Sequence, residues 1–140
     1  MRKLFTLLAV VLTAIAAIVA NAGSASAFGS EKLGCYVTPS HTQPQLSSAG
    51  CTTTMPASSY QAVFGVMNET GSYTYAWSVP TPYRSKIGMG CTSGYDYCEL
   101  INLTPTSQIT VSVTISQNGR SATLSVTADI EPWCGNYFCG

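Results

Sequence analysis

The chain has 140 residues, of which only 9% are charged and 46% are apolar, and its six basic residues balance its six acidic ones. This composition argues against a disordered chain, because disorder goes with high net charge and few apolar residues. It also argues against a nucleic-acid partner, because binding to phosphates needs an excess of Lys and Arg.

Residues 1–27 have the pattern of a secretory signal. Arg2 and Lys3 give a positive start, a 17-residue run broken only by two threonines follows, and Ala25-Ser26-Ala27 is a small-x-small cleavage site. The run is at the lower length limit for a membrane span, so we expect cleavage after Ala27 and no membrane anchor. Residues 28–140 are then expected to form one secreted, extracellular domain with a formal charge of −2.

The first half of this domain contains two predicted strands. The region 38–59 is rich in Ser, Thr and Pro and is expected to hold loops and an edge strand. Tyr60–Met67 has strand character, with Gly65 marking a bulge or a close approach of another group. After a turn at 68–72, large apolar side chains alternate with smaller ones, which is typical of a half-buried strand; these are Tyr73, Tyr75, Trp77 and Val79.

The region 80–105 is expected to end the second strand and to contain one more short strand. Pro80, Pro82 and the Gly88–Gly90 stretch should end the second strand, and a short strand is predicted at Leu100–Leu103, before Pro105.

Residues 109–130 carry the clearest pattern in the chain. Two runs of alternating apolar and Ser or Thr residues flank Asn118-Gly119, the strongest short signal for a hairpin turn. A two-residue turn there pairs Val113 with Leu124 and Thr114 with Thr123, so apolar residues share one face and hydroxyls the other. We interpret the hydroxyl face as a solvent face; the alternative is a regular array that meets an ordered lattice such as ice or a polysaccharide.

Six cysteines lie in residues 28–140, and an even number in a small exported domain predicts three disulfides. Short separations favour pairing of neighbours along the chain. The alternative of a zinc site is disfavoured because the close pairs have C-x6-C and C-x4-C spacing and His41 lies elsewhere. We expect no metal and no cofactor. The predicted disulfide pairs are Cys35–Cys51, Cys91–Cys98 and Cys134–Cys139.

The segment Tyr73-Thr74-Tyr75-Ala76-Trp77 and the closing hairpin together resemble the immunoglobulin-like and PKD-like β-sandwich modules of secreted bacterial proteins. The resemblance covers roughly residues 60–130. About six to seven short strands with frequent turn signals predict an all-β, antiparallel β-sandwich, which the cysteines would stabilise by disulfides. The resemblance implies that this sandwich is immunoglobulin-like. The chain lacks the central inter-sheet disulfide and the tyrosine corner of antibody domains. Such modules mostly serve binding, adhesive or spacer roles.

Catalytic residues are not evident in the sequence. His41 is the only histidine and lies in a loop-like segment, and no nucleophile motif accompanies it. Asp129 and Glu131 could form the carboxylate pair of a glycosidase, but a few acids on a secreted domain usually serve solubility. We therefore expect a protein that is not an enzyme.

Aromatic residues in two predicted disulfide loops are the candidate ligand-binding residues. Rigid loops present Trp and Tyr at low entropic cost. We expect binding to an extracellular glycan or protein; the alternatives are a secreted inhibitor or effector of a foreign hydrolase that uses the 94–97 loop, or a purely structural role in covering the core. The candidate ligand-binding residues are Trp133, Tyr137, Phe138, Tyr95 and Tyr97. The sequence leaves the oligomeric state open.

Overall fold

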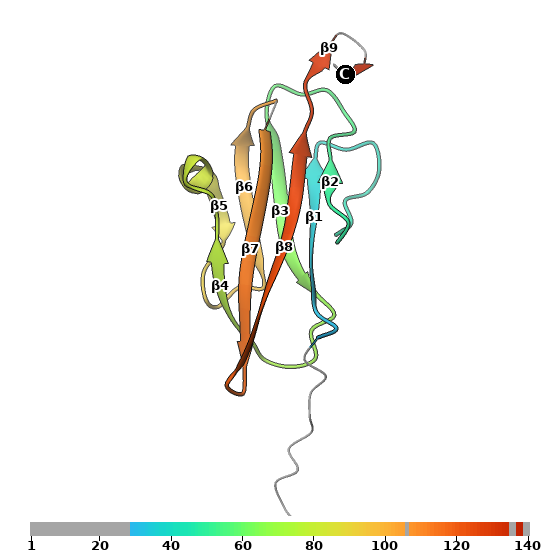
Figure 1. The fold of residues 1–140 in the computed structure, drawn as a ribbon. Coiled ribbons are helices and arrows are strands. Elements are labelled where there is room, and N and C mark those ends of the chain that lie inside the picture. The colour runs from blue at the N-terminus through green and yellow to red at the C-terminus, as the bar shows by residue number, and fades with distance from the viewer. Residues whose placement is uncertain (1–28, 106, 135–136, 139–140) are drawn as a thin grey trace, which may run out of the picture.

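Two β-sheets packed face to face make up the molecule (Figure 1). The computed structural model describes residues 29–105, 107–134 and 137–138. The predicted signal at 1–27 lies outside the described residues, so its cleavage stays a prediction. Within the described part of the chain, no helix has the length and apolar character that a membrane span requires.

Each sheet has four strands. The strands of the first sheet, in spatial order, are β1 (Lys32–Thr38), β3 (Tyr60–Met67), β6 (Tyr97–Leu103) and β5 (Ile87–Gly90). Those of the second sheet are β2 (Cys51–Thr52), β8 (Arg120–Ile130), β7 (Ser107–Gln117) and β4 (Thr74–Ser78). A short 3₁₀ helix, η1 (Thr81–Lys86), joins β4 to β5, and a terminal hairpin follows β8, formed by β9 (Trp133–Cys134) and β10 (Tyr137–Phe138).

The strand order is that of an immunoglobulin constant-type domain. In that fold strands A, B, E and D form one sheet and C, F and G the other. Here the first sheet follows the order A-B-E-D, and β8, β7 and β4 follow G-F-C. The immunoglobulin-like sandwich predicted from the sequence is confirmed. One strand pair departs from the antiparallel expectation, since β2 runs parallel to β8.

The core lies between the two sheets and is filled mainly by alternate residues of β3, β6, β7 and β8. Phe64 and Leu100 from the first sheet and Val111 and Val113 from the second are fully buried. The hydroxyl of buried Tyr60 donates to the carbonyl oxygen of Met55 at 3.0 Å and accepts from the backbone N–H of Ala57. The buried hydroxyl of Tyr60 thus has a hydrogen-bond partner both as a donor and as an acceptor, as buried polar groups usually do.

The β7–β8 hairpin has the register expected from its Asn-Gly turn. Val113 lies opposite Leu124, and Thr114 lies opposite Thr123. On the outer face, four successive pairs of hydroxyls form hydrogen bonds across the two strands, with 2.8–2.9 Å between the two oxygens of each pair. The pairs are Thr110–Thr127, Ser112–Ser125, Thr114–Thr123 and Ser116–Ser121. The lattice alternative for this face is not tested by the structure.

Two of the three predicted disulfides are present in the described residues. Cys35–Cys51 joins β1 of the first sheet to β2 of the second, and Cys91–Cys98 joins the end of β5 to β6. The third predicted bond involves Cys139, which lies outside the described residues, so that pairing stays a prediction.

Strands β1 and β5 were not expected, and β6 is longer than the predicted Leu100–Leu103. Gly88–Gly90, expected to end a strand, belongs to β5. In β1 the glycine has a packing role that local pattern does not reveal. Gly34 lies directly opposite Gly65 of β3, and the side chain of Leu46 covers both. Gly65 is therefore a point of close approach, as the sequence suggested.

Candidate binding surface

The Cys91–Cys98 loop reverses the chain tightly between β5 and β6. Gly90 and Cys91 both have positive φ, at 69° and 59°, a region that glycine adopts freely and other residues seldom do. The N–H of Cys91 donates to the carbonyl oxygen of Tyr97 at 3.0 Å, and the disulfide bridges the same two strands. The loop is therefore fixed at its base by both a covalent bond and a backbone hydrogen bond.

The same loop is tied across to β4 of the other sheet. The backbone N–H of Tyr75 donates to the carbonyl oxygen of Ser93 at 3.3 Å. The indole N–H of Trp77 donates to the carbonyl oxygen of Tyr95 at 2.9 Å. These two bonds join the loop to the second sheet and cover the edge of β4.

Apolar side chains are exposed along β5 and this loop. Tyr95 is 49% exposed, Met89 60% and Ile87 39%. In the described part of the chain, these three are the large apolar side chains that are exposed. The rings of Tyr95 and Tyr97 meet edge to face, with centroids 5.4 Å apart. Tyr97 also lies against Gly90, which continues the surface from the loop to β5. We call Ile87, Met89, Tyr95 and Tyr97 the β5 surface.

A half-buried carboxylate, Glu69, holds the neighbouring strand β4. The hydroxyl of Tyr75 donates to Oε1 of Glu69 at 2.6 Å. Burial raises the pKa of Tyr75 well above the ordinary range for tyrosine, and the hydrogen bond to Glu69 raises it further. Tyr75 therefore stays neutral and keeps its hydroxyl as a donor, which holds β4 against the turn before it.

The predicted site residues fall into two separate groups. The structure brings Tyr95 and Tyr97 together. Trp133 and Phe138 lie opposite each other in the β9–β10 hairpin, and Tyr137 lies opposite Cys134. Figure 1 shows β9 at one end of the sandwich, away from the chain that follows β5. The side chains of Trp133, Tyr137 and Phe138 lie outside what the structure describes, so their role in binding stays a prediction.

The sequence did not point to Met89 or Ile87. The glycines around them indicated the end of a strand, and exposure of an apolar residue depends on which strands lie beside it. The only available signal was a methionine between two glycines, without a charged neighbour.

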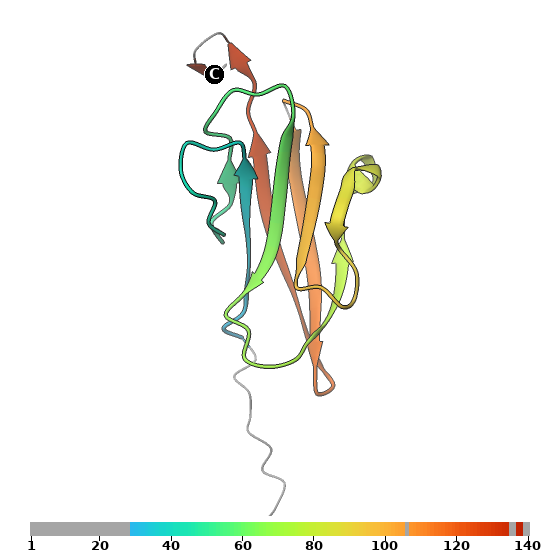
Figure 2. The same ribbon diagram turned by 180° about the vertical axis from the view of Figure 1, so that it is seen from behind.

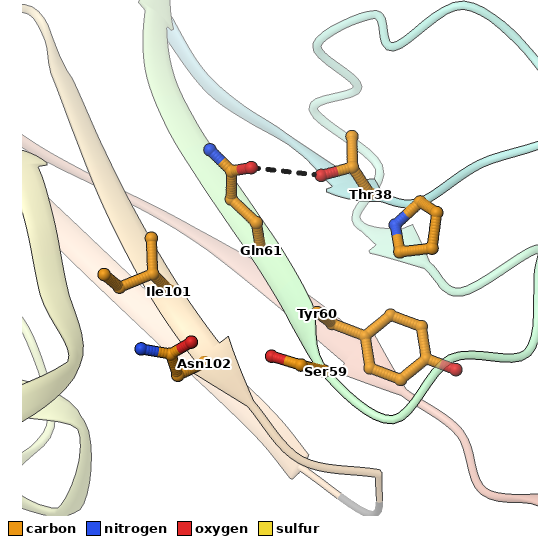
Figure 3. Close-up of a pocket in the computed structure, with 7 residues that line it drawn as sticks. Thr38, Ser59, Tyr60, Gln61, Ile101 and Asn102 are labelled. Carbon is orange, nitrogen blue, oxygen red and sulfur yellow. Dashed lines mark hydrogen bonds between the residues drawn. The ribbon is translucent and has the colours of Figure 1, made fainter.

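A shallow depression of about 510 Å³ lies on the outer face of the first sheet. Thr38, Gln61, Ile101 and Asn102 are among the residues that line it (Figure 3). The hydroxyl of Thr38 donates to Oε1 of Gln61 at 3.3 Å, and Nε2 of Gln61 donates to Glu99. The side chain of Gln61 is thus engaged on both sides, and the depression includes none of the predicted site residues.

The groups considered for catalysis lie apart from this surface. His41 is exposed, and its backbone N–H donates to the hydroxyl of Thr54. Asp129 is in β8, whereas Glu131 follows the end of that strand and donates its backbone N–H to Thr53. Within the described residues, no group of three His, Cys, Asp or Glu side chains is placed to hold a metal ion.

Comparison with known proteins adds a distant structural likeness. No protein-family model and no curated protein matches the chain. Among solved structures, the PKD domain of human KIAA0319 is similar, with 18% identity and a TM-score of 0.44 over 84% of this chain and 100% of that domain. The assignment of an immunoglobulin-like fold rests on the strand order given above.

Proposed function

We propose that this protein is an extracellular binding module and that the β5 surface contacts its partner. The observation that carries the proposal is the exposure of Met89 and Tyr95 beside a loop that is held by a disulfide and tied to β4. Exposed apolar side chains contribute favourable free energy to binding when a partner removes their surface from water. Because the loop is already fixed, little conformational entropy is lost on binding.

The chemistry of the β5 surface favours a protein over a glycan as partner. A sugar ring stacks on an open aromatic face, but the planes of Tyr95 and Tyr97 are 77° apart, so the two rings do not form one platform. Met89 and Ile87 add flexible and branched aliphatic groups, which suit the apolar core of a protein interface.

The geometry also favours a flat contact over insertion into an enzyme cleft. A cleft inhibitor needs a loop that projects from its scaffold. Here the loop is bound back onto β4 through Ser93 and Tyr95. The hydrolase-inhibitor alternative therefore has less support from the structure than a surface contact.

Capture on the immobilised, oxidised protein tests the proposal. The probes are secreted proteins, cell-wall fragments and insoluble polysaccharides from cultures that produce the protein. We compare the wild type with a Tyr95→Ser/Met89→Ser variant and with a Trp133→Ala/Tyr137→Ala variant. A protein retained by the wild type and the second variant but lost from the first supports the proposal. Retention of a polysaccharide, or loss of the protein only in the second variant, contradicts it.

A further inference from the structure

The four edges of the two sheets are not equally protected. The edge of β1 is covered, because Cys35 and Ser47 exchange two backbone hydrogen bonds of 3.0 and 2.9 Å. The edge of β2 is only two residues long. The edge of β4 is covered by the Cys91–Cys98 loop, through the bond from Tyr75 to Ser93.

The edge of β5 is open by contrast. β5 pairs with β6 on one side, and no strand of the described residues pairs with its other side. Exposed edges usually carry a Lys, a proline or an inward charge that prevents a further strand from pairing. The sequence of β5, Ile-Gly-Met-Gly, contains no Lys, proline or charge, and its one irregularity is a register shift against β6 between Ile87 and Gly90. Gly88 is exposed, and the two side chains of β5 are exposed apolar ones.

From this geometry we infer that the partner contributes an extended peptide segment that adds to the first sheet beside β5. This inference rests on the proposed function and names how the partner is bound. In strand addition, backbone hydrogen bonds provide affinity, and alternate side chains provide specificity. Ile87 and Met89 supply the apolar contacts along the strand, and Tyr95 extends them beyond its end.

Charge next to the strand sets the chemistry of the segment. Arg84 and Lys86 lie in the last turn of η1, directly before β5. Nε of Arg84 donates to the carbonyl oxygen of Val79 and Nζ of Lys86 to that of Asn102, so both positive charges are held near the start of β5. An acidic residue of the partner at that end is therefore favoured, and a basic one is disfavoured. The segment is expected to be apolar at alternate positions, with an Asp or Glu beside the start of β5.

A second copy of the chain is the competing occupant. Pairing of β5 with itself would involve four residues of each copy. A stable dimer buries about 800 Å² on each partner, far more than so short a strand pair provides. A peptide segment needs no such area, since weak, transient complexes form through smaller contacts.

Selection of linear peptides from a displayed random library on the oxidised protein provides the test. Each selected peptide is also made with N-methyl groups at alternate residues, which removes the donors along one edge. The protein variants are Met89→Lys, which places a charge on the open edge, and Gln108→Lys, which places the same charge at an exposed position of β7.

Strand addition predicts selected peptides with alternating apolar residues that shift the amide resonances of residues 87–90. Affinity is expected to fall about ten-fold or more with N-methylation in one of the two alternating frames and with Met89→Lys, but not with Gln108→Lys. If no linear peptide is retained, or N-methylated peptides bind equally in both frames, strand addition is wrong, while a captured folded protein leaves the proposed function standing. Concentration-dependent dimers abolished by Met89→Lys would assign the edge to a second copy and overturn the inference.

Discussion

The pair of glycines under Leu46 gives the sharpest prediction about stability. A Cβ at Gly34 would lie 3.0 Å from the Cβ of Leu46, 3.3 Å from its backbone carbon and 2.6 Å from Sδ of Met67. A Cβ at Gly65 would lie 2.8 Å from Cδ1 of Leu46, which is the end of a flexible, half-buried side chain. Rotation of Leu46 relieves the second contact but not the first, since its Cβ and backbone cannot rotate away.

Gly34→Ala is therefore expected to destabilise the protein by about 1–3 kcal/mol, the usual cost of overpacking. The change pushes the segment around Leu46 off β1, where Ser47 pairs with Cys35. Gly65→Ala is expected to change the free energy of unfolding by no more than about 0.5–1 kcal/mol. Alanine lowers the conformational entropy of the unfolded chain, and this stabilising effect offsets the cost of displacing the Leu46 side chain.

Urea unfolding of the oxidised protein, followed by tyrosine and tryptophan fluorescence, measures both changes. Leu46→Ala is the matched second variant. It removes the methyl groups of Leu46 that would contact the new Cβ in Gly65→Ala. It keeps the Cβ of Leu46, which would contact the new Cβ in Gly34→Ala. We expect Leu46→Ala to relieve whatever strain Gly65→Ala causes and to leave the cost of Gly34→Ala in place. A Gly34→Ala variant as stable as the wild type, or one restored by Leu46→Ala, would refute the packing argument.

Three further predictions concern the surroundings of individual side chains. The hydrogen bond from the Tyr73 hydroxyl, and after it the one from the Gly29 N–H, lowers the pKa of Glu31. The stability that these bonds to the carboxylate provide is present above the unfolded-state pKa of Glu31 and is lost as pH falls through its folded-state pKa. In Glu31→Gln the urea midpoint should therefore depend less on pH below about 4.5. Burial raises the pKa of Tyr75, so its contribution is present below about 10 and lost as pH rises further, and ultraviolet titration should lose its last-ionising tyrosine in Tyr75→Phe. Trp77→Phe removes the bond to the loop carbonyl; we expect a cost of about 0.5–1.5 kcal/mol and faster amide exchange at residues 92–97, and unchanged exchange there would contradict the anchoring role.

Local patterns predicted the parts of the fold that depend on neighbours in sequence. The β7–β8 register follows from alternation around Asn118-Gly119, and the two described disulfides follow from short separations. Strand β1 could not be predicted in this way, because Gly34 interrupts its pattern and is accommodated only by Leu46 from a distant loop. Strand β5 was missed because its glycines resemble a strand end and its pairing with β6 is set by the sheet.

The candidate site was only half visible in the sequence for the same reason. Tyr95 and Tyr97 stood out as aromatics between two close cysteines, and the structure brings them together. Met89 became a candidate only once β5 was seen at an unprotected edge. Exposure is a property of the assembled sheets, and a methionine between two glycines does not by itself predict it.

The most direct test of the binding surface is the affinity of the captured protein partner for three forms of this chain. We would titrate the wild type, Tyr95→Ser and Trp133→Ala by calorimetry under the same salt conditions. A contact at the β5 surface predicts roughly a thirty-fold weaker Kd for Tyr95→Ser, the loss typical of a central aromatic contact, and an unchanged Kd for Trp133→Ala. An unchanged Kd for Tyr95→Ser with a large loss for Trp133→Ala would contradict the account and place the contact on the C-terminal hairpin.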